Sequence, residues 1–147
     1  MYASNPVRWG KAGAGVLILA RDTGRILLTL RSGAVMEPHT WGVPGGKLDE
    51  GETALQAAER EMDEELGIVP EPGSRLTLLY TFKETGFRYD TFIGIVARES
   101  AVRPRLNWES DDAQWFDLDE LPSPLHPGVR GMMRAKGVKA TLREAVR

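Results

Sequence analysis

Three glutamates near the middle of the chain, Glu61, Glu64 and Glu65, have the spacing of side chains that gather on one side of a helix. Like charges three or four residues apart repel and destabilise a helix, and the macrodipole disfavours anions in its C-terminal turns. Carboxylate oxygens are ligands that suit Mg²⁺ or Mn²⁺, and Mg²⁺ in proteins is typically shared with substrate phosphates. The pattern therefore predicts metal-assisted attack of water on a phosphate ester or anhydride.

The competing interpretation is a solvated acidic face. Residues 46–68 hold eight of the 21 acidic side chains of the chain, and most charged runs are simply exposed. Arg60 is the only basic residue of the expected helix, so the sequence does not indicate a face laced with salt bridges. A divalent cation would relieve the repulsion, and this favours the metal site.

The residues that must position these carboxylates form a loop and a helix. Val43-Pro44-Gly45-Gly46 brings a backbone almost free of side chains to the helix, where a carbonyl can ligate a metal. Thr53 and Gln56 form a capping-box pattern, and Gly67 is placed to end the helix in a left-handed turn. At about 100° per residue, the stripe expected to be buried comprises Leu55, Ala58, Met62 and Leu66.

Strands are expected on both sides of this helix. Residues 16–20 and 25–30 read as a hairpin, residues 75–82 and 87–97 as a strand pair, and residues 113–118 as a shorter strand. The loop of residues 33–46 is dense in Gly and Pro, and residues 128–146 read as one terminal helix. Interleaved strands and helices with hairpins indicate a mixed sheet between helices, an α/β or α+β sandwich.

Length and composition are those of one globular domain. The chain has 147 residues, 41% of them hydrophobic, a net charge of −2 and no cysteine, which excludes disulfides and a cysteine nucleophile. The charge does not favour nucleic acid as a partner. The N-terminal residues lack the apolar core of a signal peptide, and the longest apolar run, residues 14–20, is too short to cross a bilayer. We therefore expect a cytoplasmic protein without a membrane partner.

The acidic stretch also has a recognisable pattern. Gly46 is followed by five residues, Glu52, seven more residues, and then Arg60-Glu61-Met62-Asp63-Glu64-Glu65-Leu66-Gly67-Ile68. This resembles the Nudix box at every one of its fixed positions, and nine specified positions at two fixed spacings make a specific match. The resemblance extends from about Val16 to Pro122, and on it the chain is identified as a MutT-like member of the Nudix hydrolase family.

The resemblance implies an αβα sandwich around a mixed sheet, with residues 1–147 as a single domain, residues 1–12 as a tail and residues 127–147 as a C-terminal helix. It also implies Mg²⁺- or Mn²⁺-dependent hydrolysis of a nucleoside diphosphate linked to another group. Its metal ligands here would be Glu61, Glu64, Glu65 and the carbonyl of Gly45.

Other residues receive roles from the same resemblance. Glu52 and Arg60 would orient the cluster. A further acidic ligand from a later loop is expected to be Glu109, with Asp111 and Asp112 as alternatives. The general base is open between Glu64 and Glu109, and one to three metal ions fit the expected mechanism.

The substrate is less defined. Residues 109–122 resemble the corresponding part of MutT-like nucleoside triphosphate hydrolases, some of which act on oxidised purine nucleotides. A nucleoside triphosphate converted to the monophosphate and pyrophosphate is therefore the first expectation, with a nucleotide-sugar, ADP-ribose or a dinucleoside polyphosphate as alternatives. Residues that could stack on a base or contact a phosphate, although each is also a plausible core or surface residue, are Trp41, Phe82, Phe87, Tyr89, Trp108 and Trp115 for the base and Arg8, Arg31, Lys47 and Arg88 for the phosphate.

Two interpretations other than an enzyme stay open at this stage. One is a Nudix-like nucleotide-binding module without catalysis, which the complete box disfavours. The other is an acidic helix that only forms a protein interface, for which Mn²⁺ and nucleotide would leave the melting temperature unchanged. A monomer and a homodimer are both compatible with the sequence.

Overall fold

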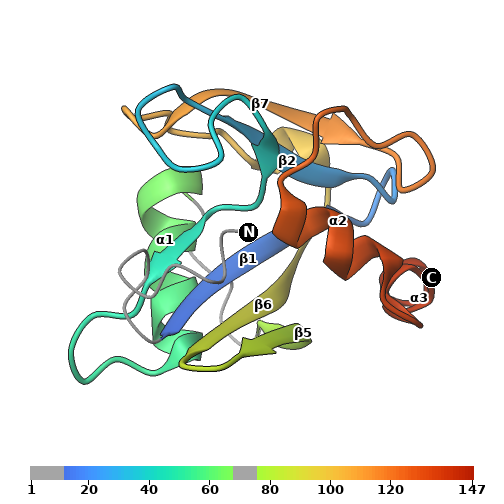
Figure 1. Cartoon of the computed structure of the whole chain (residues 1–147). Helices are drawn as coiled ribbons and strands as arrows, with labels where there is room; N and C mark the ends of the chain where they lie inside the picture. Colours follow the sequence, from blue (N-terminus) through green and yellow to red (C-terminus); the bar gives the residue numbers. More distant parts are fainter. Residues whose placement is uncertain (1–11, 68–75) are drawn as a thin grey trace.

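A mixed seven-stranded sheet lies between one helix and a pair of helices (Figure 1). The computed structural model describes residues 12–67 and 76–147. Helix α1 (Ala54–Leu66) covers one face of the sheet, and α2 (Pro127–Arg134) with α3 (Val138–Ala145) covers the other. The predicted αβα sandwich is confirmed. No helix in the described part of the chain is long and apolar enough to span a membrane.

Strand β1 (Ala12–Ala20) is the centre of the sheet. It runs parallel to β6 (Phe87–Val96) and antiparallel to β2 (Ile26–Arg31) and β4 (Gly45–Lys47). Strands β3 (Trp41–Gly42) and β7 (Ser110–Phe116) pair with β2, and β5 (Thr77–Glu84) pairs with β6. A short 3₁₀ turn, η2 (Glu99–Ala101), follows β6. The single parallel pair makes the sheet mixed.

The apolar run of β1 is buried on both faces, which alternate along the strand. Leu17 and Leu19 pack against α2 and α3, whereas Val16 and Ile18 pack against α1. A strand buried on both faces is apolar throughout rather than alternating. This is why the sequence of β1 shows a continuous apolar run.

The expected strands are present, with shifted bounds. The hairpin of β1 and β2 and the hairpin of β5 and β6 both form, although β1 begins at Ala12 rather than Val16 and β7 ends at Phe116 rather than Leu118. The prediction of an unstructured loop over residues 33–46 was incomplete, because β3 and β4 form inside it by pairing with β2 and β1. Arg75 lies outside the described residues.

Helix α1 begins and ends as predicted. The Thr53 hydroxyl accepts a hydrogen bond from the Gln56 amide at 3.1 Å, the Gln56 side chain accepts one from the Thr53 amide at 2.9 Å, and Gly67 is left-handed with φ of 62°. The predicted buried stripe was wrong at Leu55, which is 41% exposed. The buried face instead begins at the small residues Ala57 and Ala58 and includes Glu61.

The predicted single helix over residues 128–146 was also wrong. The chain forms α2 and α3, and the break lies at Gly137, whose φ of 84° is left-handed and not helical. Two short helices can each turn an apolar side to the sheet, with Met132 from α2 and Leu142 from α3 in the same core cluster.

Truncation of Leu142 tests how far α3 belongs to this core. The side chain is 0% exposed, and Leu142→Ala should lower the free energy of unfolding by about 2–5 kcal/mol because it leaves a cavity. Urea unfolding measures the change. Thr141→Ala, on the exposed side of the same helix, is the control and should stay within about 0.5 kcal/mol of the wild type.

Candidate functional site

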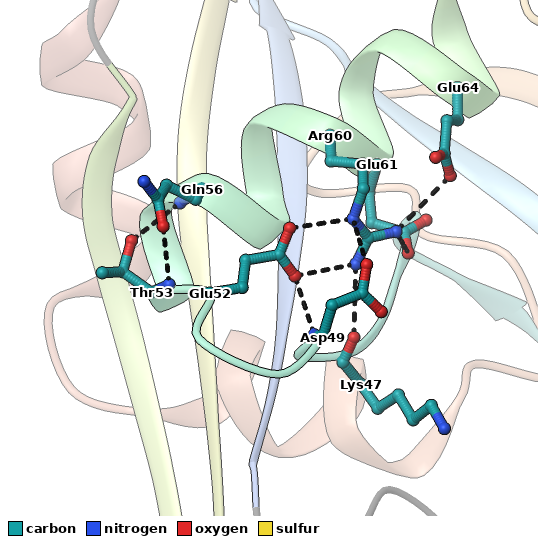
Figure 2. Close-up of polar contacts among 8 residues, drawn as sticks. All are labelled: Lys47, Asp49, Glu52, Thr53, Gln56, Arg60, Glu61 and Glu64. Carbon is teal, nitrogen blue, oxygen red and sulfur yellow. Dashed lines mark hydrogen bonds and ion pairs between the residues drawn. The ribbon is translucent and has the colours of Figure 1, made fainter.

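Arg60, in the middle of α1, is the centre of an ion-pair network that includes residues of the helix and of the loop before it (Figure 2). Its guanidinium donates to both carboxylate oxygens of Glu52, at 2.9 and 3.0 Å, and to the Lys47 carbonyl at 3.3 Å. It also lies 3.3 Å from Asp49 and donates to Glu61 at 3.2 Å and Glu64 at 3.5 Å. A bidentate arginine–carboxylate pair has a fixed geometry, so Glu52 holds Arg60 in the position from which it reaches the other acids.

This network corrects one expectation from the sequence. The acidic face does carry ion pairs, because Arg60 pairs with four carboxylates, those of Asp49, Glu52, Glu61 and Glu64. The hydrogen bond from Arg60, followed by that from the Asp49 amide, lowers the pKa of Glu52. Glu52 is therefore ionised at neutral pH, as an orienting partner of Arg60 must be.

Glu61 and Glu65 have raised pKa values, in contrast to Glu52. Glu61 is only 8% exposed, and burial is the main cause that raises its pKa. Burial, followed by the charges of Glu61, Glu109 and Glu64, raises the pKa of Glu65 to about 8. Without a cation, Glu65 is thus mostly protonated at neutral pH. The structure brings these carboxylates within electrostatic range of each other, as the helical spacing indicated.

Glu109 lies near the cluster and comes from the loop before β7. Its charge acts on Glu61 and Glu65, and its carbonyl accepts a hydrogen bond from the Ser32 amide at 2.9 Å, which holds the loop before β7 in place. The alternatives point elsewhere. Asp112 accepts hydrogen bonds from the Ala113 amide at 2.7 Å and the Gln114 amide group at 3.3 Å, and Asp111 is exposed. Of the three candidates, Glu109 is the one that these contacts favour.

The donor set fits a divalent cation. Within residues 12–67 and 76–147, no three His, Cys, Asp or Glu side chains are gathered into a group that would hold a metal ion as they stand. However, partly buried carboxylates whose pKa values are raised by burial and mutual repulsion are the groups that a cation would deprotonate and draw together. Their oxygens are hard donors, the kind that Mg²⁺ and Mn²⁺ prefer.

Gly45 is held where no other residue fits. A Cβ at this position would collide with the Tyr89 hydroxyl and would lie 2.5 Å from the Ala14 carbonyl oxygen. The Tyr89 ring also covers Gly13, where a Cβ would be 2.8 Å from its Cδ2, and its hydroxyl lies over Gly15. Gly13, Gly15 and Gly45 thus leave the space that the Tyr89 side chain fills. This contact fixes the backbone of Gly45, the expected carbonyl ligand.

A pocket opens on the α2 side of the sheet, beside this tyrosine. Aromatic rings of β5 and β6 form much of its wall, and the first turns of α2 form another part. Its lining comprises Arg31, Gly42, Val43, Gly45, Tyr80, Phe82, Tyr89, Thr91, His126, Gly128, Val129 and Met132. An apolar pocket with a few polar groups is the usual form of a small-molecule site.

Arg31 joins the pocket to the acidic cluster. It lines the pocket, its Nε donates to the Met36 carbonyl at 2.8 Å, and burial lowers its pKa. The charges of Glu109 and Glu65 act on it in the opposite direction, and Arg31 in turn opposes the raised pKa of Glu65. The positively charged Arg31 guanidinium therefore lies between the aromatic pocket and the acidic cluster.

Of the other residues predicted to contact the substrate, some line the pocket and others do not. Of the aromatic residues, Phe82 and Tyr89 line the pocket and Phe87 packs against both, at ring-centroid distances of 6.1 and 6.5 Å. The three tryptophans do not line it: Trp41 packs on Phe116, Trp115 packs on the core, and Trp108 is 69% exposed.

Of Arg31, Lys47 and Arg88, the predicted phosphate contacts within the described residues, Arg31 is the one that lines the pocket. Lys47 is exposed, Arg88 is paired with Asp90 at 3.1 Å, and Arg8 lies outside the described residues. Sequence reasoning missed Tyr80 and His126. His126 caps α2 by accepting the Gly128 amide at Nδ1, and the Pro127 that follows it was the only signal of a helix start there.

Comparisons agree with this geometry. The model of the NUDIX domain family matches residues 10–136. The chain is 31% identical over 124 residues to a nucleoside triphosphate pyrophosphatase/Nudix hydrolase fusion protein of Bifidobacterium longum, with 78% of this chain and 25% of that protein covered. It is 32% identical over 114 residues to the oxidized purine nucleoside triphosphate hydrolase of Danio rerio, with coverages of 72% and 67%.

A solved structure is similar along most of its length. The MutT NUDIX hydrolase of Burkholderia pseudomallei shares 34% identity and superposes with a TM-score of 0.65, covering 84% of this chain and 95% of that one. The chain spans only a quarter of the Bifidobacterium relative, so the activity of that whole protein is not carried over to it.

The pKa of Glu65 makes metal-free stability depend on pH. Between its ordinary value of 4.5 and about 8, the folded state holds a proton that the unfolded state has lost. Stability from this group is therefore complete below the lower value and falls as pH rises, by at most about 1.4 kcal/mol per pH unit. Urea unfolding of the chelator-treated protein from pH 5.5 to 8 measures the slope.

Glu65→Gln should flatten that slope, and Glu59→Gln, on the exposed side of the same helix, should leave it as in the wild type. Equal slopes in the wild type and Glu65→Gln would contradict the assignment of the raised pKa to Glu65.

Proposed function

The chain belongs to the Nudix hydrolase family, and from that premise we propose that it hydrolyses a nucleoside triphosphate to the monophosphate and pyrophosphate. The observation that carries the proposal is the position of Arg31 between the aromatic pocket and the acidic cluster. A nucleotide has the same order of groups, with an aromatic base at one end and phosphates at the other. The proposal takes residues 1–147 as a single Nudix domain acting on a small nucleotide.

Nudix hydrolases generally use divalent metal cations. Here Glu61, Glu64, Glu65, Glu109 and the Gly45 carbonyl are the groups proposed to hold Mg²⁺ or Mn²⁺. Such a cation, when bound, neutralises phosphate charge and lowers the pKa of a bound water. Its arrival would also remove the repulsion that raises the pKa of Glu65.

The residues of the chain supply orientation and proton transfer. Arg60, fixed by Glu52, aligns Glu61 and Glu64 through hydrogen bonds of 3.2 and 3.5 Å. Glu64 or Glu109 takes the proton of the attacking water. The water breaks a phosphoric anhydride bond of the nucleoside triphosphate and so separates the monophosphate from pyrophosphate. Glu64 has an exposed carboxylate at the end of the network, and Glu109 approaches from the loop before β7, so either group can meet a water from solvent.

Arg31 and the aromatic rings position the substrate. The Arg31 guanidinium can bind a phosphate at the mouth of the pocket, where its burial strengthens a charge-assisted hydrogen bond. Tyr80, Phe82 and Tyr89 give the base a surface on which to stack. The name of the Danio rerio relative supports an oxidised purine nucleoside triphosphate as one substrate of this class.

A substrate panel tests the proposal. It comprises deoxynucleoside and ribonucleoside triphosphates, their oxidised purine forms, ADP-ribose, nucleotide-sugars, dinucleoside polyphosphates and coenzyme A, each with Mg²⁺ and with Mn²⁺. Pyrophosphate released from a triphosphate is the expected result. Turnover confined to another class would reassign the substrate, and no metal-dependent product from any compound would reject the hydrolase.

Removing a ligand carboxylate tests the metal site. Glu64→Gln and Glu65→Gln should each lower kcat by at least about 100-fold at saturating Mg²⁺, because each removes a charged ligand from the reacting centre. Glu59→Gln keeps the helix and the chemical change but lies on its exposed side, and it should stay near the wild-type rate. Near-normal rates for both cluster variants would contradict the mechanism.

Substituting Arg31 tests the phosphate contact. Arg31→Met should raise KM for the triphosphate by about tenfold or more, since a hydrogen bond to a charged group contributes about 1.5–3 kcal/mol. Arg31→Lys should recover part of the loss because it keeps the charge but not the planar fork. Arg134→Met, exposed on α2, is the control. An unchanged KM in Arg31→Met would assign Arg31 to holding its loop alone.

A further inference from the structure

Glu84, the last residue of β5, has a buried carboxylate oxygen that nothing in the described protein satisfies. Its Oε2 is the only buried side-chain nitrogen or oxygen without a hydrogen-bond partner among the described residues. The residue as a whole is partly exposed, and leaving one buried carboxylate oxygen without a hydrogen bond is unfavourable. Such a group in a folded protein needs an explanation, and an absent ligand is one.

The position of Glu84 relates it to the pocket. Strand β5 shifts register between Leu78 and Tyr80, and from Tyr80 onward alternate side chains face the α2 side. Tyr80 and Phe82 line the pocket on that side, so Glu84 is the next side chain in the same row. Lys83, between them, faces the opposite side and is exposed. Glu84 therefore lies about 7 Å along the strand from Phe82.

Its surroundings on the neighbouring strand are aromatic. Glu84 is paired with Phe87, and Phe82 with Tyr89, in the β5–β6 ladder at the sheet edge (Figure 1). Phe87 is buried and its ring lies 6.1 Å from that of Phe82 and 6.5 Å from that of Tyr89. The carboxylate thus stands at the end of a row of rings, on the surface proposed to hold the base.

Arg31 lines the pocket, whereas Glu84 lies outside its lining, as the next residue of the row that Tyr80 and Phe82 begin. Arg31 stands where the pocket meets the acidic cluster, and Glu84 stands beyond Phe82 toward the hairpin of β5 and β6. A nucleotide with its phosphates at Arg31 and its base on the rings directs an edge of that base toward Glu84. A carboxylate only accepts hydrogen bonds, so this edge must carry N–H donors.

We propose that Glu84 binds the Watson–Crick edge of a guanine-type base and so selects guanine nucleotides over adenine nucleotides. That edge presents two adjacent donors, the N1–H and the 2-amino group, to the two oxygens of one carboxylate. Adenine presents one donor beside an unprotonated nitrogen, which the carboxylate repels. Oxidation at C8 leaves the guanine donors in place. This inference rests on the proposed nucleotide site and adds the residue that sets its specificity.

Binding of monophosphates tests the inference without catalysis. Titration calorimetry on the full chain with dGMP, dIMP and dAMP should give affinity in that order, with dGMP at least about tenfold tighter than dAMP. dIMP lacks the 2-amino group and should lie between them. A wild-type protein that binds dAMP as tightly as dGMP would overturn the inference.

Glu84→Gln keeps the shape and removes the charge and one acceptor. It should weaken dGMP by about tenfold or more and strengthen dAMP, because the amide can donate to the adenine nitrogen that the carboxylate repels. Glu120→Gln, an exposed carboxylate with the same chemical change, should keep the wild-type preference. An unchanged ratio of dGMP to dAMP affinity in Glu84→Gln would overturn the role of Glu84.

Two further readouts separate this inference from the others. Unliganded Glu84→Gln should melt at or above the wild-type temperature, because the buried oxygen without a partner no longer belongs to a charged group. A lower melting temperature with an unchanged dGMP preference would show a purely structural residue. If the binding pattern holds but the substrate panel yields no product, the proposed hydrolysis fails while the role of Glu84 stands.

Discussion

Repulsion among the carboxylates at the end of α1 is the constraint on which the rest of the site depends. Glu61, Glu65 and Glu109 are close enough to affect one another, and two of them are removed from water. Arg60 can only partly compensate, because its two strongest hydrogen bonds go to Glu52. The fold thus places more negative than positive charge in this cluster. A divalent cation together with Arg31 can neutralise the excess.

Glycine and tyrosine connect this cluster to the pocket. The Tyr89 ring lies on Gly13, Gly15 and Gly45, so one side chain lines the pocket and also packs against the backbone of the expected carbonyl ligand. Larger residues at these positions would displace either the ring or the strand. Because β1 is the strand that both helical layers cover, the geometry of the site is tied to the centre of the core.

The pocket itself has a direction. Its acidic-cluster end carries Arg31, its wall carries aromatic rings, and the row of side chains that forms this wall continues to Glu84. The proposed role of Glu84 calls for a ligand with an anionic end near Arg31 and hydrogen-bond donors at its other end. Those donors would satisfy the buried Oε2 of Glu84.

The sequence by itself determined what is local. The helix of the acidic cluster, its capping box and its left-handed end follow from residues a few positions apart, and the structure has all three. The match of residues 46–68 to the Nudix box is likewise a property of the sequence alone. Only the tertiary structure decided that the buried face of α1 includes Glu61 and not Leu55, where the C-terminal helix breaks, and which residues line the pocket. Those outcomes depend on packing between segments distant in the chain. Tyr80 and His126 line the pocket because of sheet register and helix placement, which no local pattern encodes. Glu109, in contrast, was already expected from the resemblance, and its charge acts on Glu65.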